Sequence, residues 1–141
     1  MSLIASVREY LLTYDGLEDA AGFLIDVLNK NPTQYALVPL PGVKIIEEYI
    51  DGRSRRQYPF ALQSMESVAD DAARTATNEF YEALADWLEA QSDAGNLPTL
   101  DDGKTPESIN AVGQPILLQF GDSGTGMYQI QCRLIYEQEA P

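Results

Sequence analysis

The chain contains no histidine and a single cysteine, Cys132, among its 141 residues. Without histidine there is no imidazole to act as a general base, to activate a serine or cysteine nucleophile, or to bind a metal ion. One cysteine cannot form an internal disulfide or a cysteine-rich metal site. These absences exclude several large classes of enzyme, and the sequence predicts no metal centre and no cofactor.

Positive charge is also scarce, because 9 lysine and arginine residues stand against 22 aspartate and glutamate residues, for a formal net charge of −13. Readers of nucleic acid and proteins that dock on anionic membranes need a basic surface. No apolar run approaches the roughly 20 residues of a membrane-spanning helix. The opening residues lack the basic and continuous apolar regions of a secretory leader. We therefore expect no tight binding to nucleic acid, no membrane contact, and synthesis in a reducing cytoplasm.

What is present is the composition of a soluble globular protein, with 45% apolar and 22% charged residues. A chain of this length buries enough surface for one substantial core. We predict a single domain over residues 1–141.

Two segments have helical periodicity. Residues 3–13 form a short amphipathic pattern with Ser2 as a plausible N-cap, and its apolar stripe packs either on the core or on a neighbouring subunit. A longer helix is predicted over 67–92, with Ser67 as N-cap and Ala94-Gly95 as the stop. Its apolar stripe consists of Val68, Ala72, Ala76, Phe80, Leu84, Trp87 and Leu88.

The remaining ordered segments read as strands. The predicted strands are residues 23–28, 35–38, 44–50, 55–63, 108–120 (as one or two strands) and 128–136. The connections are residues 17–22, the turn at 29–32, a long acidic loop over 93–107 and a glycine-rich turn over 121–126.

The strand pattern carries three finer predictions. Asp51-Gly52 between two β-prone runs is a strong hairpin signal. Pro59 indicates an edge or bulged position, because proline cannot donate to a central ladder. Cys132 lies on the apolar side of the last strand and should be a buried, inert thiol. Together the segments predict an α+β fold, with an antiparallel or mixed sheet of about five to six strands packed against one long helix, plus a short N-terminal helix.

No catalytic constellation emerges. The carboxylate pairs Glu47-Glu48, Asp70-Asp71 and Asp101-Asp102 are parts of a generally acidic surface. The glycine-rich turn over 121–126 precedes a strand and lacks the lysine of a phosphate-binding loop. We predict that the protein is not an enzyme.

The best candidate contact is Arg53, Arg55 and Arg56, which place three of the nine positive charges beside the hairpin turn. They are either a solvated tip or a contact with an acidic patch of the next subunit, and contacts of that head-to-tail type close into rings. The apolar stripe of the first helix, with Leu3 and Val7, is a second candidate interface.

Three stretches resemble a known family: residues 2–11, residues 80–88 running on to 97–98 and 103–105, and residues 128–136. They resemble small proteins of prophages and tailed phages of Gram-positive bacteria, which lie in the head–tail gene region and are described as minor capsid or tail-completion proteins. The order of elements is also similar to that of phage tail terminators. Those α+β subunits form a ring that caps the tail tube and joins it to the head.

The resemblance implies a non-enzymatic virion component at the head–tail junction. Its partners would be further copies of itself in a ring, for which a hexamer is one candidate, together with tail-tube and head-completion proteins. An alternative is a small acidic binding module that mimics DNA or inhibits a host protein, with its carboxylates arrayed along one face. A third, an acetyltransferase or small hydrolase, is disfavoured because the glycine-rich segment opens a strand and not a helix.

Overall fold

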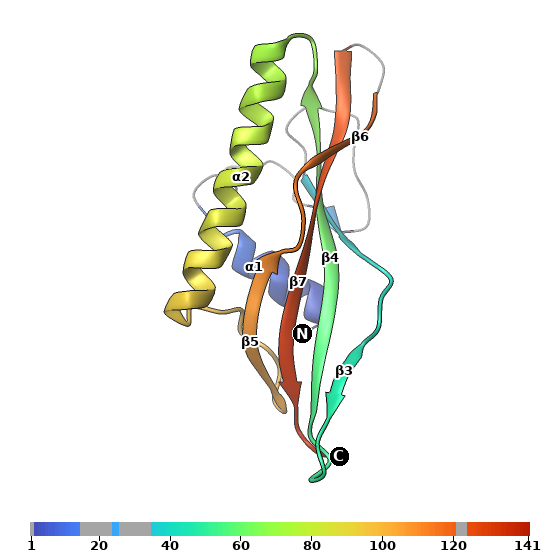
Figure 1. Cartoon of the computed structure of the whole chain (residues 1–141), viewed down its shortest axis with the longest axis vertical. Helices are drawn as coiled ribbons and strands as arrows, with labels where there is room; N and C mark the ends of the chain where they lie inside the picture. Colours follow the sequence, from blue (N-terminus) through green and yellow to red (C-terminus); the bar gives the residue numbers. More distant parts are fainter. Residues whose placement is uncertain (1, 15–23, 26–34, 121–123) are drawn as a thin grey trace.

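A computed structural model of the chain describes residues 2–14, 24–25, 35–120 and 124–141 (Figure 1). The fold is α+β, as predicted. Its elements in chain order are α1 (Leu3–Leu11), β1 (Leu24–Ile25), β2 (Tyr35–Pro39), β3 (Ile45–Glu48), β4 (Ser54–Ser67), α2 (Asp71–Ala94), β5 (Lys104–Ala111), β6 (Ile116–Phe120) and β7 (Thr125–Gln138).

The sheet is organised around β4 and β7, two strands of 14 residues each. They pair antiparallel without interruption from Ser54↔Gln138 to Ser67↔Thr125, and we call this pair the central ribbon. Strands β3 and β2 both pair with the other edge of β4, β3 near its start and β2 farther along. Strands β6 and β5 both pair with the other edge of β7, β6 near its start and β5 farther along. The two-residue β1 pairs parallel to β2, so the sheet is mixed, and among the described residues it has seven strands, slightly more than predicted.

Both helices contribute to the core that covers one face of the ribbon (Figure 1). The alternation of β4 points Phe60 and Leu62 at this face, where they are completely buried. The last strand supplies Ile130 and Leu134, and its Cys132 is buried as predicted. Helix α2 contributes Tyr81, Leu84 and Leu88, while α1 contributes Val7 and Leu11.

The start of α2 differs from the prediction. Asp70, and not Ser67, is the N-cap, and its carboxylate accepts a hydrogen bond from the Ala73 amide at 2.8 Å. Ser67 is instead the last residue of β4, because the ribbon continues farther than the apolar pattern indicated. Gly95 ends the helix in the left-handed region with φ of +79°, as the predicted stop requires.

The buried face of α2 is also rotated from the predicted stripe. Ala72 and Ala76 are exposed, whereas Thr77 and Tyr81 are buried. Alanine fits either environment, so it carried little information about orientation. Tyrosine has a polar tip but buries a large apolar ring, and Tyr81 anchors the helix on the sheet.

Pro59 does not lie in an edge strand, because β4 is at the centre of the sheet. The reason a proline is tolerated there is local. Pro59 falls between the segments of β4 that pair with β2 and with β3, and its carbonyl accepts from the Leu40 amide at 3.0 Å on that side. The missing N–H therefore points into the gap between two flanking strands and breaks no ladder bond.

The predicted acidic loop over 93–107 is shorter than expected, because β5 already begins at Lys104. Ser92 near the end of α2 fixes this strand, since its hydroxyl donates to the Ile109 carbonyl at 2.7 Å and accepts from the Ile109 amide at 3.0 Å. The predicted break between 108 and 120 is confirmed as the gap between β5 and β6. Four of the predicted segments lie wholly or partly outside the described residues. They are 17–22, 29–32, most of 23–28, and the first part of the turn over 121–126.

Candidate functional site: the outer strands

The turn of the β3–β4 hairpin is built around Gly52, whose φ of +94° is a conformation that side chains rarely adopt. Its amide donates to the Tyr49 carbonyl at 3.0 Å, and the Tyr49 amide donates to the Arg53 carbonyl at 2.8 Å. The predicted hairpin is thus confirmed. Ile50 lies in this turn, and its side chain is fully exposed.

Arg53 is bonded within its own chain. Its Nε lies 2.6 Å from Asp51 Oδ2 and its Nη1 lies 2.8 Å from Glu137 Oε1 at the end of β7. Its guanidinium also lies over the Tyr49 ring, 5.2 Å from the centroid. The backbone and side-chain hydrogen bonds from Arg53 lower the pKa of the Asp51 carboxyl. These contacts fasten the turn to the central ribbon.

The other two arginines of the predicted cluster are also engaged. Arg55 Nε lies 2.8 Å from Glu107 Oε2 of β5, and Arg56 Nε donates to Ser54 Oγ at 2.9 Å. The three side chains therefore do not form a bare positive tip. Their contact with an acidic patch of a second subunit stays a prediction, and it would have to share guanidinium groups that already have partners.

The two candidate interface residues of the first helix lie in different surroundings. Ser2 caps α1 as predicted, with its hydroxyl accepting from the Ala5 amide at 3.2 Å. Val7 is 0% exposed and belongs to the core, so it offers no surface to a neighbouring subunit. Leu3 is half-buried against the same core. The structure thus places the apolar stripe of α1 mainly inside the chain.

Exposed apolar side chains gather instead around β3. Every residue of this strand is exposed. The side chains Val43, Ile45, Ile46 and Ile50, which we call the β3 patch, leave from 36% to all of their surface in solvent. The signal was available in the sequence, because two adjacent isoleucines in a strand ordinarily point to opposite faces and one of them must then leave the core.

A second exposed apolar group lies at the other side of the ribbon, where β5 ends and β6 begins. It consists of Val112, Ile116 and Leu118, which are 51%, 46% and 44% exposed, and we call it the β6 patch. Neither patch was predicted. Large aliphatic side chains are often buried, so these two exposed groups are candidate contact surfaces.

The outer strands carry irregularities that disfavour pairing with a further strand. The register shifts at Ile46 in β3, at Glu107 in β5 and at Leu118 in β6. A bulge of this kind twists an edge away from regular pairing. Two of the shifted residues belong to the patches. Contacts at the patches would therefore use side chains and not strand addition.

The exposed face of α2 is acidic. Its six carboxylates are all exposed, and at 3.6 residues per turn they fall within about a quarter of the helix circumference. We call them the acidic stripe: Asp71, Glu79, Glu82, Asp86, Glu89 and Asp93.

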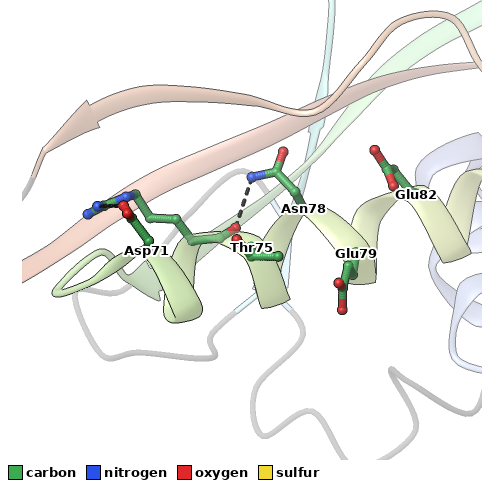
Figure 2. A pocket seen from close by; sticks show the side chains of 6 residues that line it. Asp71, Thr75, Asn78, Glu79 and Glu82 are labelled. Atoms are coloured by element: carbon green, nitrogen blue, oxygen red, sulfur yellow. Dashed lines mark hydrogen bonds and ion pairs between the residues drawn. The ribbon is translucent and has the colours of Figure 1, made fainter.

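A hollow beside the first half of this helix is lined, among the described residues, by side chains of α2 alone (Figure 2). Arg74 pairs with Asp71 there and donates from Nη1 to the Val68 carbonyl at 2.6 Å. The Asn78 amide donates to the Arg74 carbonyl at 2.9 Å. Because the lining side chains described all come from one helix, the hollow brings together no groups from separate elements that could converge on a substrate.

A buried polar chain joins α2 to the ribbon. Tyr81 Oη and Ser64 Oγ are 2.5 Å apart, and Ser64 also bonds the half-buried Glu66 carboxyl. Burial raises the pKa of Glu66 and of the Tyr81 phenol. Burial also raises the pKa of Cys132 to about 12, which keeps the thiol protonated and unreactive at neutral pH. The raised pKa values of these three groups therefore follow from their packing in the core.

Within the described residues, no three cysteine or acidic side chains come together to hold a metal ion. None of the described helices combines the length and apolarity needed to cross a membrane. No protein-family model matches the chain, and the comparison with curated proteins found no similar sequence.

Proposed function

We propose that the chain is a non-enzymatic structural subunit of the head–tail junction of a tailed phage. In this proposal it is a tail terminator or tail-completion protein that assembles as a ring in the virion and contacts the tail-tube and head-completion proteins. The phage assignment rests on the resemblance of residues 2–11, 80–88 and 128–136. The β3 patch is the observation that carries the structural role, because side chains such as Ile46 and Ile50 become buried only when another surface covers them.

The acidic stripe on α2 is compatible with this role. A ring through which DNA passes must not grip the phosphates. Carboxylates along a helix give a surface that repels them, whereas a basic lining would hold them. In the proposed ring the stripe therefore faces the channel.

The function is tested in the genome that encodes the chain. Deleting the coding sequence should yield heads and tails that fail to join, visible by electron microscopy after induction. The wild-type chain supplied from a plasmid should restore complete particles. Ile46→Lys should fail to restore them, whereas Thr99→Lys, which adds the same charge at an exposed position outside both the patches and the acidic stripe, should succeed. Complete particles in the deletion strain would refute the proposal.

The acidic stripe also favours a second candidate, an acidic module that binds a basic host protein. That module would be monomeric, and its carboxylates would carry the binding. Light scattering at rising protein concentration and two salt concentrations separates the candidates. A closed oligomer supports the structural subunit. If the chain is monomeric and the deletion strain still assembles complete particles, the acidic module is supported.

A further inference from the structure

A hollow of about 300 Å³ lies between the first helix and the connection that leads from α2 to β5 (Figure 1). We call it the α1 hollow. Its volume is at the lower end of the range for small-molecule sites, about 300–1,000 Å³, so it has room for a small ligand. Its described lining comes from two segments and consists of Ser6, Glu9, Tyr10 and Thr13 from the first and Leu97 and Thr99 from the second.

Tyr10 joins the two sides of the hollow. Its phenol donates a hydrogen bond to the Asn96 carbonyl at 2.7 Å, across 86 positions of sequence. Its ring packs on Trp87 of α2, with the ring centroids 5.4 Å apart. Burial raises the pKa of the phenol to about 12, so the group keeps its proton and this hydrogen bond at neutral pH. The α1 hollow is therefore held in shape by contacts within the fold.

Ser6 contributes a hydroxyl that lacks a partner. The residue is only 3% exposed, and its Oγ is the one buried side-chain polar atom of the described residues that makes no hydrogen bond. A buried hydroxyl is ordinarily satisfied. The Cα–Cβ bond of serine turns among staggered positions, so the hydroxyl can reach a group seated in the hollow that Ser6 lines. A ligand there would supply the hydrogen bond that the free chain lacks.

The charge of the lining is negative. Glu9 is its single charged residue among those described, and it is exposed. Arg8 is the neighbouring base, but at 3.6 residues per turn it points away from the side of α1 that carries Ser6 and Tyr10. The hollow therefore favours a cation and disfavours an anion.

The hydroxyl groups complete a set of hydrogen-bond acceptors. Thr13 Oγ1 donates its proton to the Tyr10 carbonyl at 2.7 Å, which leaves its lone pairs to accept a further hydrogen bond. The Ser6 hydroxyl and the Glu9 carboxylate can accept as well, and Leu97 adds apolar surface. A cation that donates several hydrogen bonds from the end of an apolar chain matches this lining.

We propose that the α1 hollow binds a primary alkylammonium group, the group at the end of a lysine side chain or of a free aliphatic amine. An ammonium group carries one positive charge, three N–H donors and no acceptor. Glu9 supplies the opposite charge, the hydroxyls of Ser6 and Thr13 accept from the N–H groups, and Leu97 contacts the alkyl carbons. No lining residue belongs to the β3 patch or the β6 patch, so this site goes beyond the proposed function.

The test is a titration of the isotope-labelled chain, followed by NMR, with two probes: cadaverine and Nα-acetyl-lysine methylamide. Both should cause saturable shifts of the Ser6, Glu9 and Thr99 amide signals, with a dissociation constant of about 1 mM, as expected for a contact of few atoms. Tighter binding of cadaverine supports a free amine as the ligand, and tighter binding of the blocked lysine supports a lysine side chain. The Nζ-acetylated form of the blocked lysine has no charge and should not bind.

Four variants test the named groups. Glu9→Gln keeps the shape of the side chain and should weaken probe binding at least about tenfold, whereas the same change at exposed Glu89 of α2 is the matched control and should not. Ser6→Ala should weaken binding about fivefold without lowering the melting temperature, because the hydroxyl has no partner to lose in the free chain. Thr99→Lys places an ammonium group of the chain itself at the hollow and should weaken probe binding by competition.

Three results would overturn the proposal. Equal weakening in Glu9→Gln and Glu89→Gln would mean that a chain of net charge −13 attracts the cation without a defined site. Equal binding of the acetylated probe would mean that the charge is not recognised. No shift of the three amide signals up to about 10 mM probe, tenfold above the expected constant, would remove the site. Glu9 is exposed, so its variant should stay folded and keep the test valid even if Ser6→Ala does not fold. The deletion strain decides the proposed function independently of all these results.

Discussion

Strands β2 and β3 flank the same side of β4, yet one is buried and the other is exposed. In β2 the side chains of Tyr35, Ala36 and Leu37 are buried, whereas no residue of β3 is. The difference comes from what lies on each strand. Helix α1 packs on β2 and β1 pairs with its outer edge, while no described element performs either role for β3. The apolar residues of β2 therefore stabilise the fold, and those of β3 are available to a partner.

The largest effect expected from this comparison is on the free energy of unfolding. Leu37 is 0% exposed, so Leu37→Ala should lower that free energy by about 3 kcal/mol through lost burial and a cavity. Ile46→Ala in β3 removes a side chain of similar size but should change it by less than about 0.5 kcal/mol. Urea titrations at a protein concentration low enough to keep the chain monomeric measure both. Equal losses would mean that β3 is covered within the chain.

A smaller loss should follow from weakening the helix that covers β5. Asp70→Ala removes the N-cap of α2 and should cost about 1 kcal/mol, because the Ala73 amide loses its acceptor. Asp93→Ala, near the other end of the helix, is the control. Removing a carboxylate from a helix C-terminus should leave stability unchanged or slightly raised. The melting temperature should therefore fall in Asp70→Ala and should not fall in Asp93→Ala. Equal decreases in the two variants would contradict the capping role of Asp70.

A change in the opposite direction is expected at Glu66, beneath the helix. Burial raises the pKa of this carboxyl above its unfolded value, so folding is favoured when it is protonated. That favourable contribution is present below the unfolded pKa and is lost as the pH rises through the folded pKa. Glu66→Gln should thus raise the urea midpoint at pH 7 and leave it little changed near pH 4. Glu82→Gln, an exposed change on α2, should shift the midpoint at neither pH.

The smallest effect on stability is expected at the arginine tip. Arg55 and Glu107 are both partly in solvent, where ion pairs contribute little. Arg55→Gln should leave the urea midpoint within experimental error. The same variant should lower association if the tip contacts a second subunit, as the sequence predicted. Light scattering at low salt measures this, and unchanged assembly would show that the tip serves only its own chain.

The sequence predicted the strands whose residues alternate and the helix whose apolar positions recur. The alternation of the last strand correctly predicted that Cys132 is buried. The predicted apolar stripe of the long helix did not include Tyr81, although that side chain is buried. The sequence predicts a loop for part of strand β5, since Asp101-Asp102-Gly103 and Pro106 are typical turn residues. Pairing with β7 outweighs that local preference.

The candidate surfaces were harder to predict than the fold. Charge identified the arginines, but their intrachain partners Glu107 and Glu137 lie 52 and 84 residues away from them along the chain. Local sequence carries no information on pairs so distant. The adjacent Ile45 and Ile46 gave a local signal for the β3 patch, whereas the β6 patch became visible only once the sheet order showed which strands have a covered face.

The central ribbon also determines the order in which the chain can fold. Its two strands are neighbours in space but far apart in sequence, as the separation of 66 positions between Gln63 and its hydrogen-bond partner Gln129 shows. The β3–β4 hairpin, helix α2 and the β6–β7 pair all involve nearby residues and can form before that long loop closes. Pairing of β4 with β7 is then the late and slow step of folding. The entropic cost of closing the loop must be met before the hydrogen bonds of the ribbon can stabilise the structure. Until it forms, β4 and β7 expose their unpaired backbones to other nascent chains.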